Sequence, residues 1–400
     1  MLNKDGQRML AYVVKIDAIE PIEGSDNCEA AVIGGWKVMV KKNTFAAEDK
    51  VAYFEVDSLV PAENEAFAFL QRYKYKIKTQ KYTFGGKGKF FSQGLIMPFA
   101  ELGLDENLEV NTDLTAKLGV KYYEVEDNKR KSNPDKYRSM MDRHKKLFKK
   151  PFVKKIMKYA IGRKVMFALF GRKKDKKTGW PVGKFPGVAK TDQERVENMP
   201  HILSDKTPFI QTQKCDGSSG TYILEKKKFG RYEFYVCSRN VRMLDEQQES
   251  FYGVHNYYWE VAKKYAIEEK MKKWLSENPE AKWVCWQGEI CAPAIQKNPH
   301  KLKETHFYCF HWTDSVNGRL DITDAAEKWK SMDMEIVPIV NTNFILPDTM
   351  EEFKLQADGF YDASVCEGQE NCPREGFIYY KSTDPTFSFK NVSREYLLKH

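Results

Sequence analysis

The first hundred residues contain five short strand patterns and only one helical pattern, which limits the folds available to this part of the chain. The second pattern includes Gly34-Gly35, a pair that suits a two-residue hairpin turn, and the third pattern ends at Pro61. Many short strands with one intervening helix favour a small Greek-key β-barrel. The strand patterns lie at 12–22, 30–40, 50–61, 72–84 and 92–99, and the helical pattern lies at 63–73.

The fourth strand pattern is basic. Lys74, Lys76 and Lys78 recur at period two, which predicts that their side chains lie on one face of a strand. On a barrel of the OB type, such a face suits a nucleic-acid backbone. The alternative is a solvated edge strand that its lysines protect from pairing with other strands. The pattern alone favours neither interpretation.

Positive charge gathers in one segment of the chain. The formal net charge of the 400 residues is +9, yet 142–177 contains fifteen Lys or Arg residues and two Asp residues. Apolar residues recur there at helical spacing, which predicts one or two amphipathic helices interrupted at Pro151. This basic segment is interpreted as a nucleic-acid-binding arm, a membrane-surface helix, or a linker helix packed on a domain.

Composition and cysteine spacing exclude several classes of protein. The chain is 42% hydrophobic and 30% charged, which is typical of a globular protein of two or three domains. The N-terminus has no signal-peptide pattern, and no apolar run approaches the length of a membrane span. None of the eight cysteines forms a CxxC pair, so we expect reduced, mostly buried thiols in a cytoplasmic protein that does not enter membranes.

From about residue 186 the pattern is that of an α+β domain. The segment 256–278 predicts a long amphipathic helix, and two shorter helices are expected at 323–332 and 347–357. Strand patterns surround these helices. They lie at 207–213, 219–225, 232–238, 283–290, 305–312, 376–381 and 386–390.

A lysine stands directly behind the first of these strands, and more charged residues follow at the ends of later strands. Each charge alone is explained by an ordinary cap, a strand edge or a solvated surface. Their order and chemistry together are specific. The set comprises Lys214-x-Asp216-Gly, Ser238-Arg239, Gly288-Glu289, Glu375-Gly376 and Lys390 in a basic strand.

This ordered set resembles the motifs of the covalent nucleotidyltransferase superfamily, which comprises ATP-dependent DNA and RNA ligases and mRNA capping enzymes. The stretches "QKCDGSSGTY", "HFYCFHW" and "SFKNVSREYLLK" are similar to RNA ligases, and "FPGVAKTDQERVEN" to the branch with an N-terminal OB domain. The resemblance implies an α+β fold with an OB-type β-barrel at 1–125 and a basic linker or helical insertion at 126–185. A nucleotidyltransferase (ATP-grasp-like) domain of antiparallel sheets with flanking helices then occupies 186–400.

The reaction that the resemblance implies is ATP-dependent joining of RNA ends in three steps. Lys214 attacks the α-phosphate of ATP and releases pyrophosphate. AMP then moves to the 5′-phosphate of an RNA end, and a 3′-OH end finally displaces it. The resemblance assigns a hydrated Mg²⁺ or Mn²⁺ ion to three carboxylates, which are Asp216, Glu289 and Glu375.

The resemblance also implies a role for each remaining position. Lys390 matches the lysine on the α-phosphate, and Arg239 matches the arginine that contacts the ribose and the RNA ends, so both are expected to be catalytic. Phe310 matches the aromatic that stacks on adenine, although it also suits the core of its strand. Ser219 matches a polar position near the nucleotide, and Glu289 is expected to contact the nucleotide as well as the metal ion.

Acid–base chemistry explains why the lysine needs these neighbours. An amine attacks phosphorus only when it is neutral, and a free lysine with a pKa of about 10.4 is almost fully protonated at pH 7. A metal ion or a second cation lowers that pKa, whereas bare carboxylates raise it. Two positions depart from the family pattern, since Ser388 replaces a usual lysine and Gln213 replaces a frequent glutamate. Lys381 is a candidate substitute for the missing cation.

Two other kinds of function fit the same motifs. DNA ligases and capping guanylyltransferases share Lys-x-Asp-Gly, and a nucleic-acid-binding protein with an inactive transferase site would keep most of the pattern. For the leading interpretation, the partners are RNA ends in a nicked duplex or on separate strands. Lys74, Lys76, Lys78 and the basic segment are the candidate RNA contacts, and we expect a monomer.

Overall fold

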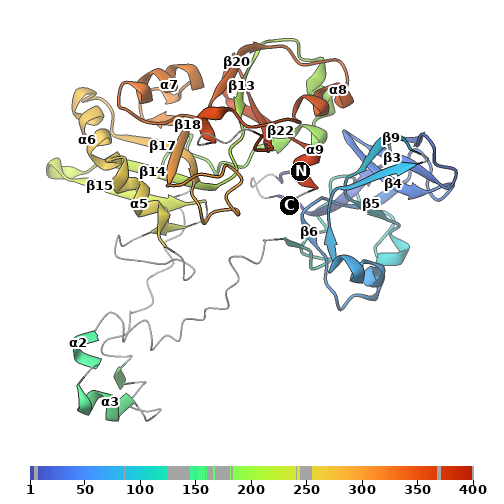
Figure 1. Ribbon diagram of the computed structural model, residues 1–400, viewed down its shortest axis with the longest axis horizontal. Helices are drawn as coiled ribbons and strands as arrows, with labels where there is room; N and C mark the ends of the chain where they lie inside the picture. The colour runs from blue at the N-terminus through green and yellow to red at the C-terminus, as the bar shows by residue number, and fades with distance from the viewer. Residues whose placement is uncertain are drawn as a thin grey trace.

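The computed structural model contains two groups of strands that lie side by side (Figure 1). We call residues 8–123 the N-terminal unit and residues 183–398 the C-terminal unit. The structure describes residues 1–3, 8–84, 86–123, 145–148, 150–157, 159, 165–166, 181, 183–239, 241–243, 255–366 and 371–398.

The N-terminal unit is built from short antiparallel sheets around two small cores. Three sheets have three strands each, in the orders β1-β5-β10, β2-β3-β4 and β11-β6-β7, and β8 pairs with β9 as a hairpin. In the described residues these sheets do not join into one closed barrel, and the predicted short-strand pattern is confirmed. The strands are β1 (Ala11–Lys15), β2 (Ala18–Pro21), β3 (Cys28–Ile33), β4 (Trp36–Lys41), β5 (Lys50–Phe54), β6 (Ser58–Leu59), β7 (Lys76–Ile77), β8 (Gln80–Phe84), β9 (Lys87–Ser92), β10 (Leu95–Met97) and β11 (Lys121–Tyr122).

The local signals in this unit are largely confirmed. Gly34 and Gly35 form the turn between β3 and β4, where Ile33 pairs with Trp36. The expected helix is present as a 3₁₀ helix, η1 (Glu65–Tyr73), and the side chain of Asn64 caps it by accepting a hydrogen bond from the Ala66 N–H at 3.0 Å. A second short 3₁₀ helix, η2 (Ala100–Leu102), follows β10.

The predicted basic strand is wrong in its first half. Lys74 ends η1 in the left-handed conformation, with φ of 54°, because its N–H closes the last turn of the helix. Within the predicted range 72–84, Lys76 and Ile77 form β7, and β8 begins at Gln80. Lys76 and Lys78 nevertheless lie near one aromatic ring, since their Nζ atoms are 3.3 Å and 5.9 Å from the centre of the Tyr123 ring. Two of the three lysines therefore remain neighbours, and Lys74 belongs to a turn.

Most of the basic segment lies outside the described residues. Its described parts include α2 (Lys145–Phe148) and α3 (Pro151–Met157), so helix is present on both sides of the predicted interruption at Pro151. Phe148, Val153 and Met166 form a small buried cluster.

Two larger sheets form the C-terminal unit (Figure 1). The six-stranded sheet has the order β16-β15-β14-β17-β18-β19, and the five-stranded sheet has the order β12-β22-β21-β13-β20. All pairs are antiparallel except β12 with β22. The strands are β12 (Glu194–Arg195), β13 (Phe209–Gln213), β14 (Ser218–Lys226), β15 (Tyr232–Ser238), β16 (Arg242–Met243), β17 (Trp283–Cys291), β18 (His306–Asp314), β19 (Gly318–Arg319), β20 (Ile339–Phe344), β21 (Gly376–Lys381) and β22 (Asp384–Val392).

All seven strands expected in this unit are confirmed, but two other expectations are corrected. The long helix is two helices, because Ala266 is left-handed with φ of 46° and breaks the chain between α5 and α6. Strand β20 gave no sequence signal because its residues are mostly exposed. The remaining elements are mostly short. They are α5 (Tyr257–Lys264), α6 (Ile267–Glu277), α7 (Ile322–Lys330), α8 (Met350–Gln356), α9 (Arg394–Leu397), η4 (Val196–Asn198), η5 (Pro200–Ser204), η6 (Lys228–Gly230) and η7 (Ala363–Val365).

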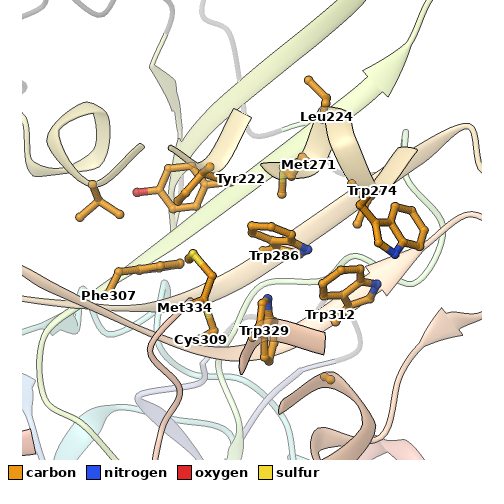
Figure 2. Packing of buried hydrophobic residues seen from close by; sticks show 14 of the residues in the cluster. Tyr222, Leu224, Met271, Trp274, Trp286, Phe307, Cys309, Trp312, Trp329 and Met334 are labelled. Carbon is orange, nitrogen blue, oxygen red and sulfur yellow. The ribbon is translucent and has the colours of Figure 1, made fainter. Parts of the chain in front are cut away.

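Tryptophans fill the core between the six-stranded sheet and its helices. Trp286 on β17, Trp312 on β18 and Trp329 on α7 are fully buried and lie next to one another (Figure 2). The ring centre of Trp312 is 5.2 Å from that of Trp286 and 5.9 Å from that of Trp329. These contacts fix the positions of β17 and β18, which both continue into the candidate site.

All eight cysteines are free thiols and seven of them are buried, as expected from their spacing. In the part of the chain that the structure describes, no helix is long and apolar enough to cross a membrane.

The two units meet through a buried carboxylate. Glu55 accepts hydrogen bonds from Arg8 Nε at 2.8 Å and from Asn198 Nδ2 at 3.1 Å. The Asn198 Oδ1 atom also accepts a hydrogen bond from Trp36 Nε1 at 2.6 Å. Burial alone would raise the pKa of Glu55, but Arg8 and the other cations hold it at about 2. The C-terminal unit therefore supplies Asn198 to an ionic network centred in the N-terminal unit.

We predict that Trp329→Ala destabilises the C-terminal unit strongly. The side chain is fully buried, and loss of a buried tryptophan typically costs about 3–5 kcal/mol of unfolding free energy. Urea denaturation followed by fluorescence would measure the change. Val316→Ala is the matched control because Val316 is 51% exposed on a nearby hairpin. Equal midpoints for the two variants would contradict the assignment of this core.

Candidate nucleotide-transfer site

The candidate site lies where the two sheets of the C-terminal unit approach each other. Lys214 directly follows β13, and its backbone N–H donates to the Gly376 carbonyl at 3.0 Å. This contact continues the β13–β21 ladder by one residue. It places the Lys214 side chain beside Glu375, which directly precedes β21. The Nζ–Oε2 distance is 2.7 Å, and the Lys214 side chain is only 23% exposed.

Two motif glycines are required by close backbone approaches. Gly376 has φ of 141°, and a Cβ atom there would lie 2.1 Å from the Asn391 carbonyl oxygen. A Cβ atom on Gly217 would lie 2.4 Å from the Ile290 carbonyl oxygen. The glycines behind Asp216 and Glu375 therefore let neighbouring strands come close enough for the charged residues to meet.

Asp216 and Glu289 complete an acidic wall around the lysine. Glu289 lies on β17 and accepts a hydrogen bond from the Gly217 N–H at 3.1 Å. Asp216 accepts a hydrogen bond from the Tyr396 hydroxyl, and its own N–H donates to His300 Nε2 at 3.1 Å. Burial and neighbouring carboxylates raise the pKa of Asp216 to about 7 and that of Glu289 to about 8. The site thus holds more negative charge than its own cations offset.

This charge favours the protonated form of Lys214. Burial alone would lower its pKa, but Glu375, Glu289 and Asp216 together raise the pKa above the ordinary lysine range. Nucleophilic attack needs the neutral amine, so the carboxylates by themselves oppose it. A divalent cation among them would offset their charge and lower the pKa of the lysine.

The donor set fits a hard, partly hydrated cation. Carboxylate oxygens are the ligands that Mg²⁺ and Mn²⁺ prefer, and Mg²⁺ usually keeps several waters. Across the described ranges, no three His, Cys, Asp or Glu side chains are gathered closely enough to enclose a metal ion alone. A metal ion at these carboxylates would take water or substrate oxygens as further ligands.

Lys390 and Arg239 share one carboxylate. Lys390 lies on β22, its side chain is 12% exposed, and its Nζ atom is 3.6 Å from Asp192 Oδ1. Arg239, at the end of β15, forms an ion pair with the other oxygen of Asp192. Burial and the charges of Arg195, Arg8 and Lys214 lower the pKa of Lys390 well below its usual value. These two predicted residues therefore come from different sheets and meet at Asp192.

Ser219 and Phe310 are placed by the register of the six-stranded sheet. Ser219 pairs with Glu289 across β14 and β17, and its hydroxyl lies 2.7 Å from the Thr191 hydroxyl. Phe310 is the unpaired residue of a β-bulge, because Gln287 pairs with His311 and Gly288 with Cys309. A bulge turns a side chain away from the normal alternation, and Phe310 is half-buried while its neighbours on both sides are buried.

Arg195 is a candidate residue that the sequence reasoning missed. It lies on β12 opposite Lys390 and is 5% exposed. One of its guanidinium nitrogens, Nη2, donates to Asp57 of the N-terminal unit at 3.1 Å. Its Nε and Nη1 atoms have no hydrogen-bond partner among the described residues. The stretch "TDQERVEN" contained this arginine, but only the parallel β12–β22 pairing shows that it adjoins Lys390.

The positions that depart from the family pattern have other partners. Lys381 follows Tyr380, the ladder partner of Ser388, and its side chain forms an ion pair with Asp205 at 2.6 Å. Gln213 is buried, and its Oε1 atom accepts a hydrogen bond from the Asp362 N–H at 2.9 Å. Gln213 therefore holds the loop at Asp362 next to Lys214.

Comparisons with known proteins match two parts of the chain to known families. A model of an OB-fold domain matches residues 10–99, and the RNA ligase family model matches residues 207–397. Among curated proteins, none is significantly similar in sequence to this chain.

The fold is similar to solved structures of an RNA ligase from Naegleria gruberi. A variant with AMP and Mn is 25% identical with a TM-score of 0.70, and it covers 98% of this chain and 99% of that chain. A variant with ATP and Mn is 24% identical with a TM-score of 0.71, and the coverage is again 98% and 99%. The same ligase with PPi is 24% identical with a TM-score of 0.69 and the same coverage.

We predict two opposite effects for Glu375→Gln. Removing the carboxylate 2.7 Å from Lys214 should lower the pKa of the lysine in metal-free protein, measured from the pH dependence of its reaction with an amine reagent. Covalent labelling by ATP with Mn²⁺ should nevertheless fall by about 100-fold or more, with the melting temperature little changed. Glu289→Gln should lose labelling similarly.

Asp205→Asn is the matched control, because it removes one carboxylate from a lysine pair outside the site. If Glu375→Gln instead unfolds the protein, the carboxylate serves the fold. If the variant is labelled more strongly than wild type, the carboxylate does not support a metal ion.

Proposed function

Residues 207–397 belong to the RNA ligase family, and from that premise we propose that this protein joins RNA ends through a lysyl-AMP intermediate on Lys214. The observation that supports this most is the position of the amine. Lys214 is largely enclosed, 2.7 Å from Glu375, and the motif carboxylates Glu375, Glu289 and Asp216 offset its charge. A solvated surface lysine would have none of these neighbours.

In the first proposed step, Lys214 forms the covalent bond. A neutral Lys214 Nζ attacks the α-phosphorus of ATP, the bond to the β-phosphate oxygen breaks, and pyrophosphate leaves. A phosphoramidate links the lysine to AMP, and the amine proton passes to solvent. The N. gruberi ligase structures with ATP, AMP and Mn support ATP and a divalent metal ion as the co-substrate and cofactor.

Asp216, Glu289 and Glu375 would hold the metal ion, whose charge would offset negative charge near the transferring phosphoryl group. The residues of the chain then act by binding and orientation. Lys390 would hold an α-phosphate oxygen, and Arg239 offers planar, bidentate hydrogen bonds to the ribose or a phosphate. Phe310, the bulged residue of β18, would stack on adenine. Ser219 would contact the nucleotide beside Glu289.

In the second and third steps, RNA replaces pyrophosphate in the site. A 5′-phosphate oxygen of the RNA attacks the phosphorus of the lysyl-AMP, which frees Lys214 and leaves AMP on the RNA end. A 3′-OH then attacks the 5′-phosphorus, AMP leaves, and a phosphodiester bond forms. The N-terminal unit lies beside the site through the Asp57–Arg195 pair, so its OB-fold surface is the proposed place for the RNA strand.

Lys214→Ala tests the proposed activity directly. The variant should lose both the covalent adenylate and the joining of 5′-phosphorylated RNA, because the amine that forms the bond to AMP is removed. Incubation with α-labelled ATP and Mn²⁺, followed by denaturing electrophoresis, measures the adduct. GTP should not label the wild-type protein, which distinguishes the proposal from a capping guanylyltransferase. Lys214→Ala protein that still forms an acid-labile AMP adduct would refute the assignment.

Replacing Lys74, Lys76 and Lys78 by Ser tests the proposed RNA path over the N-terminal unit. Adenylylation requires no RNA, so the yield of protein–AMP should stay near normal. Ligation should fall, most steeply at higher salt, since each lost phosphate contact reduces the salt slope of binding by roughly 0.7–0.9. Lys76→Ser and Lys78→Ser should matter more than Lys74→Ser, because only these two approach Tyr123. An unchanged salt slope in the triple variant would contradict this path.

A further inference from the structure

The hairpin between β14 and β15 ends in a basic and aromatic tip that the proposed chemistry does not use. Its sequence from Lys226 to Tyr232 is Lys-Lys-Lys-Phe-Gly-Arg-Tyr. Lys226 pairs with Tyr232, so the residues between them form the exposed end of the hairpin. We call residues 227–232 the hairpin tip.

Phe229 is placed where neither burial nor backbone preference favours a phenylalanine. Its side chain is 91% exposed, and its backbone is left-handed with φ of 64° and ψ of 37°. Left-handed geometry is unfavourable for residues other than Gly, Asn and Asp. The hairpin tip therefore presents a free aromatic face at the expense of local backbone strain.

The cations of the hairpin tip exceed its acids. Two acids lie at its base, Glu225 and Glu233, and both are already paired. Lys227 is 2.8 Å from Glu225 and 3.0 Å from Glu233, while Lys184 and Arg242 add one further ion pair each. Lys228 and Arg231 are exposed on either side of Phe229, and neither forms an ion pair with another of the described residues.

The hairpin tip lies on the side of the C-terminal unit opposite to the N-terminal unit (Figure 1). Strand β14 begins at Ser218, beside the candidate site, and ends at Lys226. Eight residues of strand span about 26 Å. A polynucleotide that leaves the site along this strand would reach the hairpin tip after about eight nucleotides, at roughly 3.4 Å per nucleotide in a duplex strand.

We propose that the hairpin tip is a second RNA-binding site. It binds the RNA strand at a distance from the joint, which is the point where the two RNA ends are joined. This inference rests on the proposed RNA ligase function. Phe229 stacks on an unpaired base, and Lys228 and Arg231 bind the flanking phosphates. An exposed aromatic between cations matches the way proteins bind single-stranded RNA, by stacking on bases and neutralising the backbone. The substrate class is therefore an RNA end with unpaired nucleotides about eight positions from the joint.

Direct RNA binding by the metal-free protein tests this site without requiring ligation. The probes are fluorescent 5′-phosphorylated single-stranded RNAs of 4 and 20 nucleotides, measured by anisotropy. Phe229→Ala should weaken binding of the 20-nucleotide RNA by roughly 5- to 100-fold, the range for loss of one stacked base. Binding of the 4-nucleotide RNA should not change. Phe229→Tyr keeps the ring and should restore binding.

The two cations beside Phe229, Lys228 and Arg231, are tested separately. Lys228→Gln with Arg231→Gln should reduce the salt slope of binding for the 20-nucleotide RNA by about 1.4, because two phosphate contacts to a single strand are lost. Lys272→Gln with Lys273→Gln is the matched control, since these lysines of α6 are exposed but paired with Glu268 and Glu277. Leu355→Ala controls for loss of an exposed apolar side chain, since Leu355 is 57% exposed on α8.

The outcomes distinguish RNA binding at the hairpin tip from the proposed ligase activity. Labelling of Lys214 by ATP should remain normal in every hairpin variant, because the hairpin tip does not contact the candidate site. If Phe229→Ala and the double charge variant bind the 20-nucleotide RNA as tightly as wild type, the second site is refuted. If wild-type protein binds RNA through Phe229 but joins no RNA ends, the ligase proposal fails and the hairpin site stands.

Discussion

The ion pair between Lys214 and Glu375 is the interaction on which the rest of the site depends. It connects the residue behind β13 to the residue in front of β21, at the point where the backbone ladder ends. Neither charge is fully solvated, so removing one would leave the other uncompensated, at a cost of several kcal/mol for buried pairs. The glycines beside Asp216 and Glu375 follow from the same constraint, because only they permit the strands to approach.

Each sheet of the C-terminal unit contributes a different part of the chemistry. The five-stranded sheet supplies Lys214, the proposed nucleophile, and Lys390, both close to strand ends. The six-stranded sheet supplies Glu289 and Phe310, whose positions depend on the tryptophan core beneath β17 and β18 (Figure 2). Asp192, in the connection before β12, contacts both Arg239 and Lys390 and so joins the two sets of cations. The site is therefore preorganised by packing that lies outside it.

The N-terminal unit also influences the electrostatics of the site. Arg195 lies opposite Lys390 and donates to Asp57, and the charges of Arg195 and Arg8 help to lower the pKa of Lys390. A carboxylate buried in the N-terminal unit, Glu55, holds Arg8 in place. Docking of the two units thus adds the charge of Arg8 to the larger effect of burial on the pKa of Lys390.

The sequence alone determined the seven long strands of the C-terminal unit and the identity of its charged residues, because apolar period and motif order are local properties. It also placed the turn at Gly34 and Gly35. The sequence could not show the break at Ala266, the bulge at Phe310 or the end of η1 at Lys74, since each depends on backbone geometry that tertiary packing selects. Only the tertiary structure decided that Asp192, Arg195, His300 and Tyr396 adjoin the motif residues. These neighbours are distant in sequence, and their meeting depends on how two sheets and two units pack together.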